Sequence, residues 1–341
     1  MMLFRPVREN DLDDIVRLAS RAGVGMTSLP NDAVRLAARI KRSVETFAGK
    51  LTRGEQGFLF VLEDTELSRV VGVSAIEVAV GLDEPFYNFR IQKTVRASKE
   101  LGVYKHQDLL NLSYDHTGHS ELCTLFLDPE YQKNRNGLLL SKARFVFIAA
   151  FREWFSPHLF AELRGRSDEQ GNSPFWDALG HHFFDIPFAD ADRLTGTGMK
   201  TFIAELMPAY PIYISLLPDD AREVIGQVHA NTAPARAILE KEGFGWRGSV
   251  DIFDAGPVLE AETDNIRAIR ESYSLPALQL MTPQATPTIV ANGQFDNFRA
   301  VLIAQETPGA LDQQALDALQ VNATDRVHAV TLNPEENRSW R

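Results

Sequence analysis

Cysteine is nearly absent from this sequence, because Cys123 is the only one among 341 residues. A single thiol cannot form an intrachain disulfide, and it cannot build a metal site that needs several cysteines. This scarcity excludes the disulfide-stapled secreted domains and fits a reducing compartment. We therefore expect a cytoplasmic protein without a metal site.

Basic blocks and long apolar runs are missing as well. The net charge is -11 and the pI is about 5.3, whereas nucleic acids and anionic membranes attract proteins with a positive surface. No apolar run reaches the length of a membrane-spanning helix, and residues 1–7 lead directly into charged residues. We expect no secretory leader, and neither nucleic acid nor a membrane as the partner.

Apolar sequence is plentiful, and its spacing alternates between helical and strand patterns. The length allows two to three domains of ordinary size. A helix is expected over 32–47, and strands over 57–63 and 70–80 predict a hairpin. Residues 82–118 suit a strand or a buried loop, followed by a polar turn near 115–119. The pattern indicates an α/β protein.

A strand, a polar loop and a long apolar helix follow one another over residues 120–151. Backbone N–H groups just before a helix, together with the helix dipole, suit a phosphate group. The stretch resembles the pyrophosphate-binding motif of the GNAT-type acyl-CoA N-acyltransferases, although an ordinary strand-loop-helix unit would look similar. Gln132 and Gly137 match that motif, and Arg135 stands where the family usually has a glycine.

A second motif occupies residues 231–244. Asn231 or Thr232 can cap a helix, Pro234 suits its first turn, and Gly243 is expected to end it. The stretch resembles the helix that lies beside the thiol arm of the coenzyme in GNAT-type enzymes.

These motifs imply an α/β fold of the GNAT-like acyl-CoA N-acyltransferase type, with a mixed, splayed central sheet. Beyond residue 257, short strand patterns and a helix near 311–319 predict a small β-rich C-terminal module. We divide the chain into a GNAT-like region, residues 1–256, and this module, residues 257–341. The segment near 159–224 is an insertion or a partial internal repeat.

The resemblance extends to the arginine N-succinyltransferases and covers essentially the whole chain. It implies transfer of a succinyl group from succinyl-CoA to the α-amino group of L-arginine, giving N2-succinyl-L-arginine and CoA, the first step of an arginine catabolic route. Succinyl-CoA would be a co-substrate, with no permanently bound cofactor. The blocks that carry the resemblance are residues 27–30, 75–81, 115–118, 120–129, 173–176 and 225–229.

Aminolysis of a thioester needs an uncharged amine near the carbonyl carbon, donors for the developing oxyanion and a proton for the departing thiolate. Histidine suits the proton transfers because its unperturbed pKa is about 6.5. The resemblance places the proton donor at His229 and a succinyl-CoA contact at Leu125, while the GNAT motif adds Gln132, Asn136 and Gly137 as coenzyme-binding residues. From the residues alone, His229 could simply hydrogen-bond its loop and Leu125 could simply belong to the core.

Charged side chains near the strand ends are further candidates. Glu121, Glu162 and Asp115 are carboxylates that could meet the guanidinium of the acceptor, and Arg164 could meet the succinyl carboxylate. Solvated surface charges would give the same pattern.

Two further candidate roles, a nucleophilic cysteine and a pair of metal-binding histidines, are less favoured. Cys123 could be an acylated nucleophile, but direct transfer needs no covalent intermediate and a thiol in an apolar strand is usually packed. His116 and His119 could bind a metal, but Gly118 lies between them and no third ligand stands at a recognisable spacing, which favours a solvated loop.

Three functions remain open at this point. The chain is an arginine succinyltransferase, a succinyltransferase that accepts arginine and ornithine, or a sensor that binds CoA or arginine without catalysis. The sensor is favoured only by Arg135 in the phosphate loop. Whether identical chains associate into an oligomer is also open.

Overall fold

The protein, seen in a computed structural model, is described over residues 1–22, 26–168, 172–188, 190–191, 206–207, 210–281, 286–304 and 310–333. In these ranges fourteen strands form one sheet, in the order β11-β14-β12-β13-β1-β2-β3-β6-β7-β10-β9-β4-β5-β8. The pairing of β6 with β7 is parallel, and the other pairings are antiparallel. The sheet is therefore mixed, as the sequence predicts.

The strands are β1 Met2–Pro6, β2 Gly57–Asp64, β3 Arg69–Glu77, β4 Asn88–Ser98, β5 Val103–Ser113, β6 Ser120–Leu127, β7 His158–Glu162, β8 Ile212–Tyr213, β9 Gly245–Val250, β10 Pro257–Glu262, β11 Tyr273–Pro276, β12 Thr288–Asn292, β13 Ala300–Ile303 and β14 Arg326–Thr331. The helices are α1 Leu12–Ala22, α2 Ala33–Phe47, α3 Asn136–Ala150, α4 His181–Phe184, α7 Asp219–Val224, α8 Ala233–Glu242, α9 Arg267–Arg270 and α10 Gln313–Leu319. None of these helices is long and apolar enough to cross a membrane.

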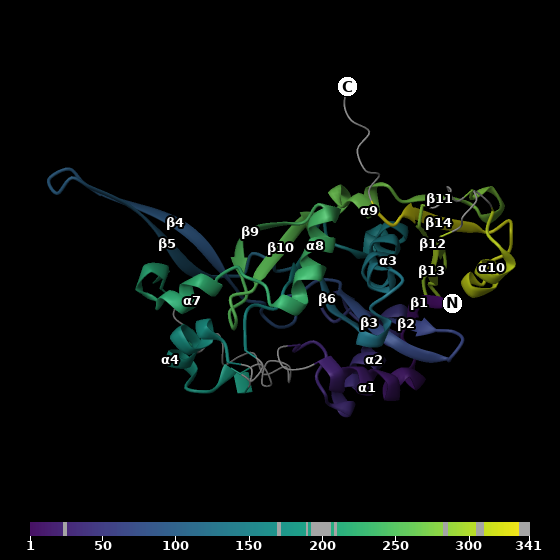
Figure 1. Ribbon diagram of the computed structural model, residues 1–341, viewed down its shortest axis with the longest axis horizontal. Helices are drawn as coiled ribbons and strands as arrows, with labels where there is room; N and C mark the ends of the chain where they lie inside the picture. Colours follow the sequence, from purple (N-terminus) through teal and green to yellow (C-terminus); the bar gives the residue numbers. More distant parts are fainter. Residues whose placement is uncertain are drawn as a thin grey trace, which may run out of the picture.

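Helices cover both faces of the central strands (Figure 1). Alternate residues of β2 point to opposite faces, as the period of a strand requires. Phe58 and Phe60 join the core beneath α3, whereas Leu59 and Val61 join the core beneath α1 and α2. Because both faces are buried, β2 is apolar along most of its length instead of alternating with polar residues.

Helix α2 and the β2–β3 hairpin form where the sequence predicts them. The side chain of Asp32 caps α2 by accepting hydrogen bonds from the N–H groups of Val34 and Arg35. The segment 82–118 holds a feature that the sequence analysis missed, a long hairpin of β4 and β5 that projects from the body (Figure 1). Its outer half is mostly exposed, so it lacks the buried face on which strand prediction depends.

The C-terminal strands extend the same sheet. Strand β13 pairs with β1, with Phe4 opposite Ala300, and α10 packs near β13. Strand β10 lies between β7 and β9, so it belongs to the central part of the sheet although it follows residue 256. The division of the chain after residue 256, and the origin of the segment near 159–224, stay predictions; parts of that segment lie outside the described residues.

Candidate active site

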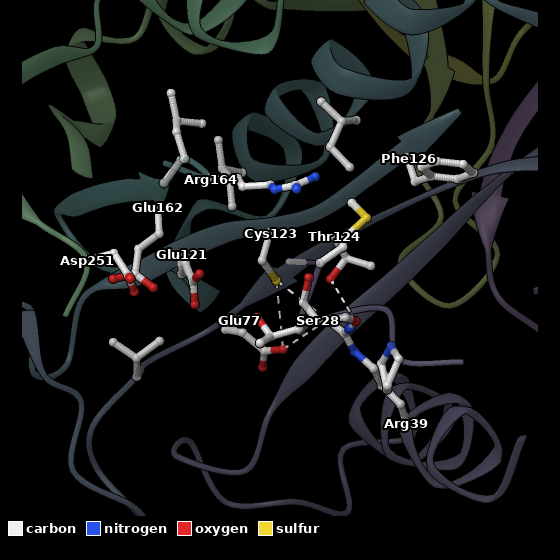
Figure 2. A pocket seen from close by; sticks show the side chains of 18 of the residues that line it. Ser28, Arg39, Glu77, Glu121, Cys123, Thr124, Phe126, Glu162, Arg164 and Asp251 are labelled. Atoms are coloured by element: carbon white, nitrogen blue, oxygen red, sulfur yellow. Dashed lines mark hydrogen bonds and ion pairs between the residues drawn. The ribbon is translucent and has the colours of Figure 1, made fainter. Parts of the chain in front are cut away.

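The site is a gap in the sheet between two neighbouring strands. Strands β6 and β7 pair only at their beginnings, where Ser120 lies opposite Leu159 and Glu121 opposite Phe160. Beyond this point the strands diverge, and a cavity of about 1390 Å³ is lined by residues of both strands and by the start of α8 (Figure 2). The splayed sheet that the sequence analysis expects is therefore present, and it is hollow where an extended ligand would enter.

Strand β6 carries a bulge at the edge of this cavity. Thr124 and Leu125 together oppose the single residue Ser74 of β3, because the register shifts between the pairs Val73–Phe126 and Ala75–Cys123. Thr124 has a φ of 54°, in the left-handed region. Such a conformation costs a β-branched residue on the order of 1–3 kcal/mol, and it re-aims the main chain of a strand. Leu125 lines the cavity and also contacts the main core, so both roles considered for it are compatible.

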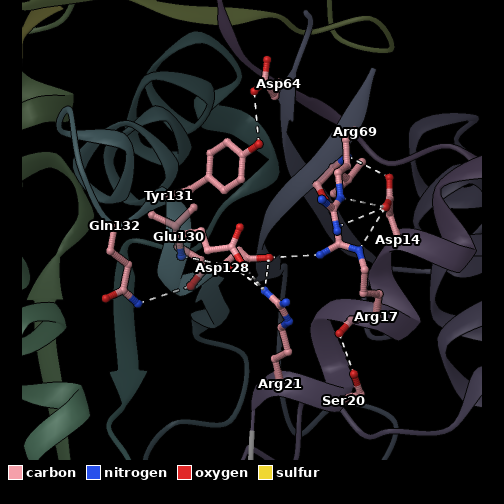
Figure 3. Close-up of polar contacts among 12 residues, drawn as sticks. Asp14, Arg17, Ser20, Arg21, Asp64, Arg69, Asp128, Glu130, Tyr131 and Gln132 are labelled. Atoms are coloured by element: carbon pink, nitrogen blue, oxygen red, sulfur yellow. Dashed lines mark hydrogen bonds and ion pairs between the residues drawn. The ribbon is translucent and has the colours of Figure 1, made fainter. Parts of the chain in front are cut away.

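The loop after β6 is anchored to α1 by an ion-pair network (Figure 3). Asp128 is only 2% exposed, and its carboxylate accepts from Arg17 Nη1 at 3.0 Å and from Arg21 Nη1 at 2.7 Å. Gln132 follows in the same loop, lines the cavity and donates from Nε2 to the carbonyl of Leu127 at 3.3 Å. The network fixes where the loop leaves the sheet.

The start of α3 explains the departure at Arg135. Asn134 and Arg135 have φ values of 52° and 64°, so the position where GNAT-type motifs usually have glycine is a left-handed one. Arg135 adopts this conformation as the N-cap residue of α3, with its side chain exposed. The predicted site residues Asn136 and Gly137 are not among the residues that line the cavity, and Asn136 Nδ2 donates to the carbonyl of Tyr131 at 3.1 Å.

His229 lies on the far side of the gap from β6. Its N–H donates to the carbonyl of Arg164 at 2.9 Å, while Val228 forms a β-bridge with Gly165. The adjacent residues Ala230 and Arg164 line the cavity, although His229 itself is not among the lining residues.

The protonation state of His229 follows from its contacts. The N–H of Asn231 donates to its Nδ1 at 3.2 Å, and a backbone N–H can only be a donor, so the hydrogen of the neutral ring is on Nε2. Burial, and then the positive charge of Arg164, lower the pKa of His229 below its usual value. The resting ring is therefore neutral near pH 7.

Carboxylates gather on one side of the cavity in Figure 2. Glu121, Glu162 and Asp251 all line it, and Glu162 accepts from Asn88 Nδ2 at 2.5 Å. Burial raises the pKa of Asp251, which also accepts hydrogen bonds from the N–H groups of its own loop. Of the charged candidates from the sequence, Asp115 is exposed and does not line the cavity.

The surroundings of Cys123 do not suit a nucleophile, and those of His116 differ from the solvated loop that the sequence predicts. Burial, followed by the negative charges of Glu121 and Glu77, raises the pKa of the Cys123 thiol to about 12, which disfavours the thiolate that a nucleophile needs. The solvated loop expected at His116 is wrong, because this ring is buried. Its Nδ1 lies 2.6 Å from Asn88 Oδ1, and its Nε2 lies 3.5 Å from Glu260 Oε1, within ion-pair distance.

Two features of the site were missed by the sequence analysis. The loop that carries Asp251 also holds Asp254, whose carboxylate accepts from the N–H groups of Gly165 and Gly256. Arg144 lies inside α3 and lines the cavity. The available signal for Arg144 was a cation in the middle of an apolar helix. In the described ranges no group of three or more His, Cys, Asp or Glu side chains could hold a metal ion.

Comparison with known proteins decides the family. The model of the arginine N-succinyltransferase beta subunit matches residues 2–268, and the model of the C-terminal domain of the same subunit matches residues 276–331. The chain belongs to the arginine N-succinyltransferase beta subunit family. The family and the acyltransferase class expected from the sequence are thereby confirmed.

Individual members of the arginine N-succinyltransferase family match over nearly their whole length. The chain is 61% identical to the arginine N-succinyltransferase of Photorhabdus laumondii subsp. laumondii, over 99% of this chain and 100% of that protein. It is 52% identical to the arginine N-succinyltransferase of Escherichia coli, over 98% of this chain and 99% of that protein.

A solved structure in the arginine N-succinyltransferase family confirms the predicted fold class. Arginine/ornithine succinyltransferase subunit AI from Pseudomonas aeruginosa superimposes with a TM-score of 0.88 at 38% identity, over 98% of this chain and 99% of that chain. The α/β fold with a mixed, splayed sheet and a β-rich C-terminal part is thus shared with this relative.

Proposed function

We propose that the chain transfers the succinyl group of succinyl-CoA to the α-amino group of L-arginine, giving N2-succinyl-L-arginine and CoA. The observation that carries this proposal is the gap between β6 and β7, bordered by a bulged strand on one side and, on the other, by Arg164 and Ala230, which lie next to His229. An extended thioester can lie along the unpaired edge of β6, where main-chain N–H groups are free to meet it. Succinyl-CoA is a co-substrate in this proposal.

The coenzyme contacts follow from the same geometry. Leu125 faces the acyl arm at the bulge, and Gln132 borders the cavity near the start of α3. The first N–H groups of a helix lack partners within the helix, and they favour an anion. We assign the pyrophosphate to this helix start, with Gly137 contributing its main-chain N–H. The N–H of Asn136 already donates to the carbonyl of Lys133 at 3.0 Å, so Asn136 would contribute by holding the loop in place.

His229 manages the protons in the proposed reaction. The amine attacks the thioester carbonyl carbon, a C–N bond forms, and the C–S bond breaks. The nitrogen loses a proton to Nδ1 of the imidazole, once Nδ1 releases the N–H of Asn231, and the sulfur gains the proton of Nε2, so the ring begins and ends neutral. A lowered pKa suits this cycle, because the resting ring can take up a proton and its imidazolium form is a stronger acid toward the thiolate.

The acceptor approaches from the acidic side of the cavity. Glu121, Glu162 and Asp251 supply the negative field that a cationic amino acid requires, and guanidinium and carboxylate groups pair well in two-point contacts. Ornithine carries an ammonium in place of the guanidinium, so the same field would attract it. One relative is named arginine/ornithine succinyltransferase, which makes ornithine the acceptor to test beside arginine.

Release of free thiol from succinyl-CoA tests the proposal. We expect release with arginine, with ornithine a weaker acceptor because it cannot make a bidentate contact. His229→Ala should lower kcat by about 10²- to 10⁴-fold, the usual contribution of a positioned acid or base. Absence of release with both amino acids would exclude an enzyme and leave the sensor. We also infer a cytoplasmic location, on the single cysteine of the sequence.

A further inference from the structure

Arg144 is a cation inside the apolar helix α3. Its side chain is among the largest that are fully buried, and the residue is only 2% exposed. Burying an ionised group without a counter-charge is costly, and such groups are normally paired. The position of Arg144 therefore needs an explanation beyond packing.

The hydrogen bonds of Arg144 all end on neutral acceptors. Its Nε and Nη2 donate to the carbonyl and hydroxyl oxygens of Ser141 at 3.0 and 3.2 Å. Its Nη1 donates to the carbonyls of Ala75 and Cys123, both at 3.3 Å. These four bonds leave one of the five guanidinium hydrogens unassigned, and no carboxylate among the described residues bonds to the group.

Four of the other arginines at the cavity have carboxylate partners. Arg42 pairs with Glu77 at 2.5 Å, Arg21 with Asp128 at 2.7 Å, and Arg35 with Asp32 at 3.4 Å. Arg39 also reaches Glu77, at 3.4 Å. The cavity thus holds several neutralised arginines near its rim and a buried one at the bulge of β6.

Arg144 stays charged in this environment. Burial lowers its pKa to about 10, which still leaves the guanidinium protonated at neutral pH. Ala75 and Cys123 are paired residues next to the register shift at Thr124, so the charge of Arg144 lies beside the bulge where the proposed thioester lies. A four-carbon acyl chain that ends in a carboxylate would bring the missing negative charge to this place.

We propose that Arg144 is the acyl-specificity residue, and that its guanidinium binds the terminal carboxylate of the succinyl group. The inference rests on the proposed function and adds the residue that separates a succinyl donor from a neutral acyl donor. A site built around a buried donor rejects an analogue that lacks the matching group, because the donor is then left without its partner. The competing position is Arg164, which lines the cavity near His229 and donates from Nη2 to Ser167 Oγ at 2.9 Å.

The test compares succinyl-CoA with butyryl-CoA, a neutral donor with the same number of acyl carbons, at saturating arginine. For Arg144→Met we expect kcat/KM with succinyl-CoA to fall by about 100-fold or more relative to kcat/KM with butyryl-CoA, beyond any loss that both donors share. Arg144→Lys keeps the charge as a point donor, so it should retain part of the preference for succinyl-CoA. Arg164→Met should lower kcat/KM by a similar factor with both donors.

Equal losses of kcat/KM with the two donors in folded Arg144 variants would overturn the inference, since they would show that the residue only holds the bulge. A loss of kcat/KM in Arg164→Met that is confined to succinyl-CoA would overturn it as well. If Arg144→Met fails to fold by circular dichroism, Arg144→Lys decides, because equal losses in that variant have the same meaning. Failure of the proposed function is distinguishable, because the wild-type chain would then release no thiol from succinyl-CoA with either amino acid.

Discussion

The buried ion cluster at the end of α8 offers a direct measure of what holds the site together. Glu242 is 0% exposed, and its carboxylate accepts from Lys142 Nζ at 2.8 Å and from Arg267 Nη2 at 2.6 Å. It also accepts from the N–H of Ala268 at 2.9 Å. Through these contacts the cluster joins α8, which lines the cavity, to α3 and α9. Glu242→Gln removes the negative charge that Lys142 and Arg267 share, and leaves Arg267 with only the partly exposed Glu271, at 3.4 Å.

Removing one member of a buried ion pair costs about 3–5 kcal/mol. The unfolding entropy is about 2.1 cal/mol/K per residue, or roughly 0.7 kcal/mol/K for a chain of this length. The Tm should therefore fall by about 4–7 °C. Glu240→Gln is the matched control on the same helix. Its pair with Arg236 is partly exposed, so the change should cost no more than about 0.5 kcal/mol and shift the Tm by less than about 1 °C.

Calorimetry of the two variants beside the wild type checks this reasoning. Equal Tm shifts for Glu242→Gln and Glu240→Gln would refute it, because burial would then have no influence on the cost of losing the charge. A large shift in Glu242→Gln that is accompanied by unchanged kinetics below the transition would show that the cluster stabilises the chain without positioning α8.

Three further predictions concern the site itself. Burial and then Arg164 lower the pKa of His229, and the neutral ring is the active resting form. The value of kcat/KM for succinyl-CoA, measured at saturating arginine so that ionisation of the free amine does not set the midpoint, should therefore fall on acidification with a midpoint below about 6.5. This midpoint should rise in Arg164→Gln, and a midpoint unmoved by this change would contradict the assignment. Cys123, with its pKa raised to about 12, should resist iodoacetamide at pH 8, and Cys123→Ala should keep activity within about threefold; inactivation of the alanine variant would restore the covalent mechanism. Asp128→Asn weakens the bonds from Arg17 and Arg21, so the KM for succinyl-CoA should rise about tenfold with a smaller change in kcat, as initial rates would show.

Periodicity and capping signals predict those parts of the fold that depend only on residues close together in the sequence. Helix α2 has an apolar stripe and an aspartate cap, and β2 with β3 has two apolar runs around a polar turn, so each could be predicted from its own residues. The same holds for the loop at Gln132, because a strand, a loop and an apolar helix were visible in order. Residues 88–113 suited either a strand or a buried loop, because the inner end of the hairpin is partly buried while its outer half has no buried face.

The bulge and the buried cation could not be predicted in the same way. Threonine is common in strands, so the residue type of Thr124 gives no indication of its left-handed φ of 54°. Arg144 was visible as a charge within an apolar helix, but a long cationic side chain can reach water from such a position as easily as it can be buried. The outcome depends on β3 and β6, whose carbonyls accept its hydrogen bonds, and these strands precede it by 69 and 21 residues.

The central strand departs from regular structure along the edge that faces the cavity, and this placement has a physical reason. A regular strand in mid-sheet gives its main-chain groups to two neighbours, whereas an extended coenzyme needs some of those groups for itself. In β6 the pairing with β7 stops after Glu121, and the bulge at Thr124 disturbs the pairing with β3. Polar contacts from helices on the two faces of the sheet hold the strand and the loop after it, from Arg144 of α3 to the carbonyl of Cys123 and from Arg17 of α1 to Asp128. It follows that substitutions of these buried groups should harm the site more than substitutions of exposed residues at its rim, because the shape of the gap depends on the buried polar contacts.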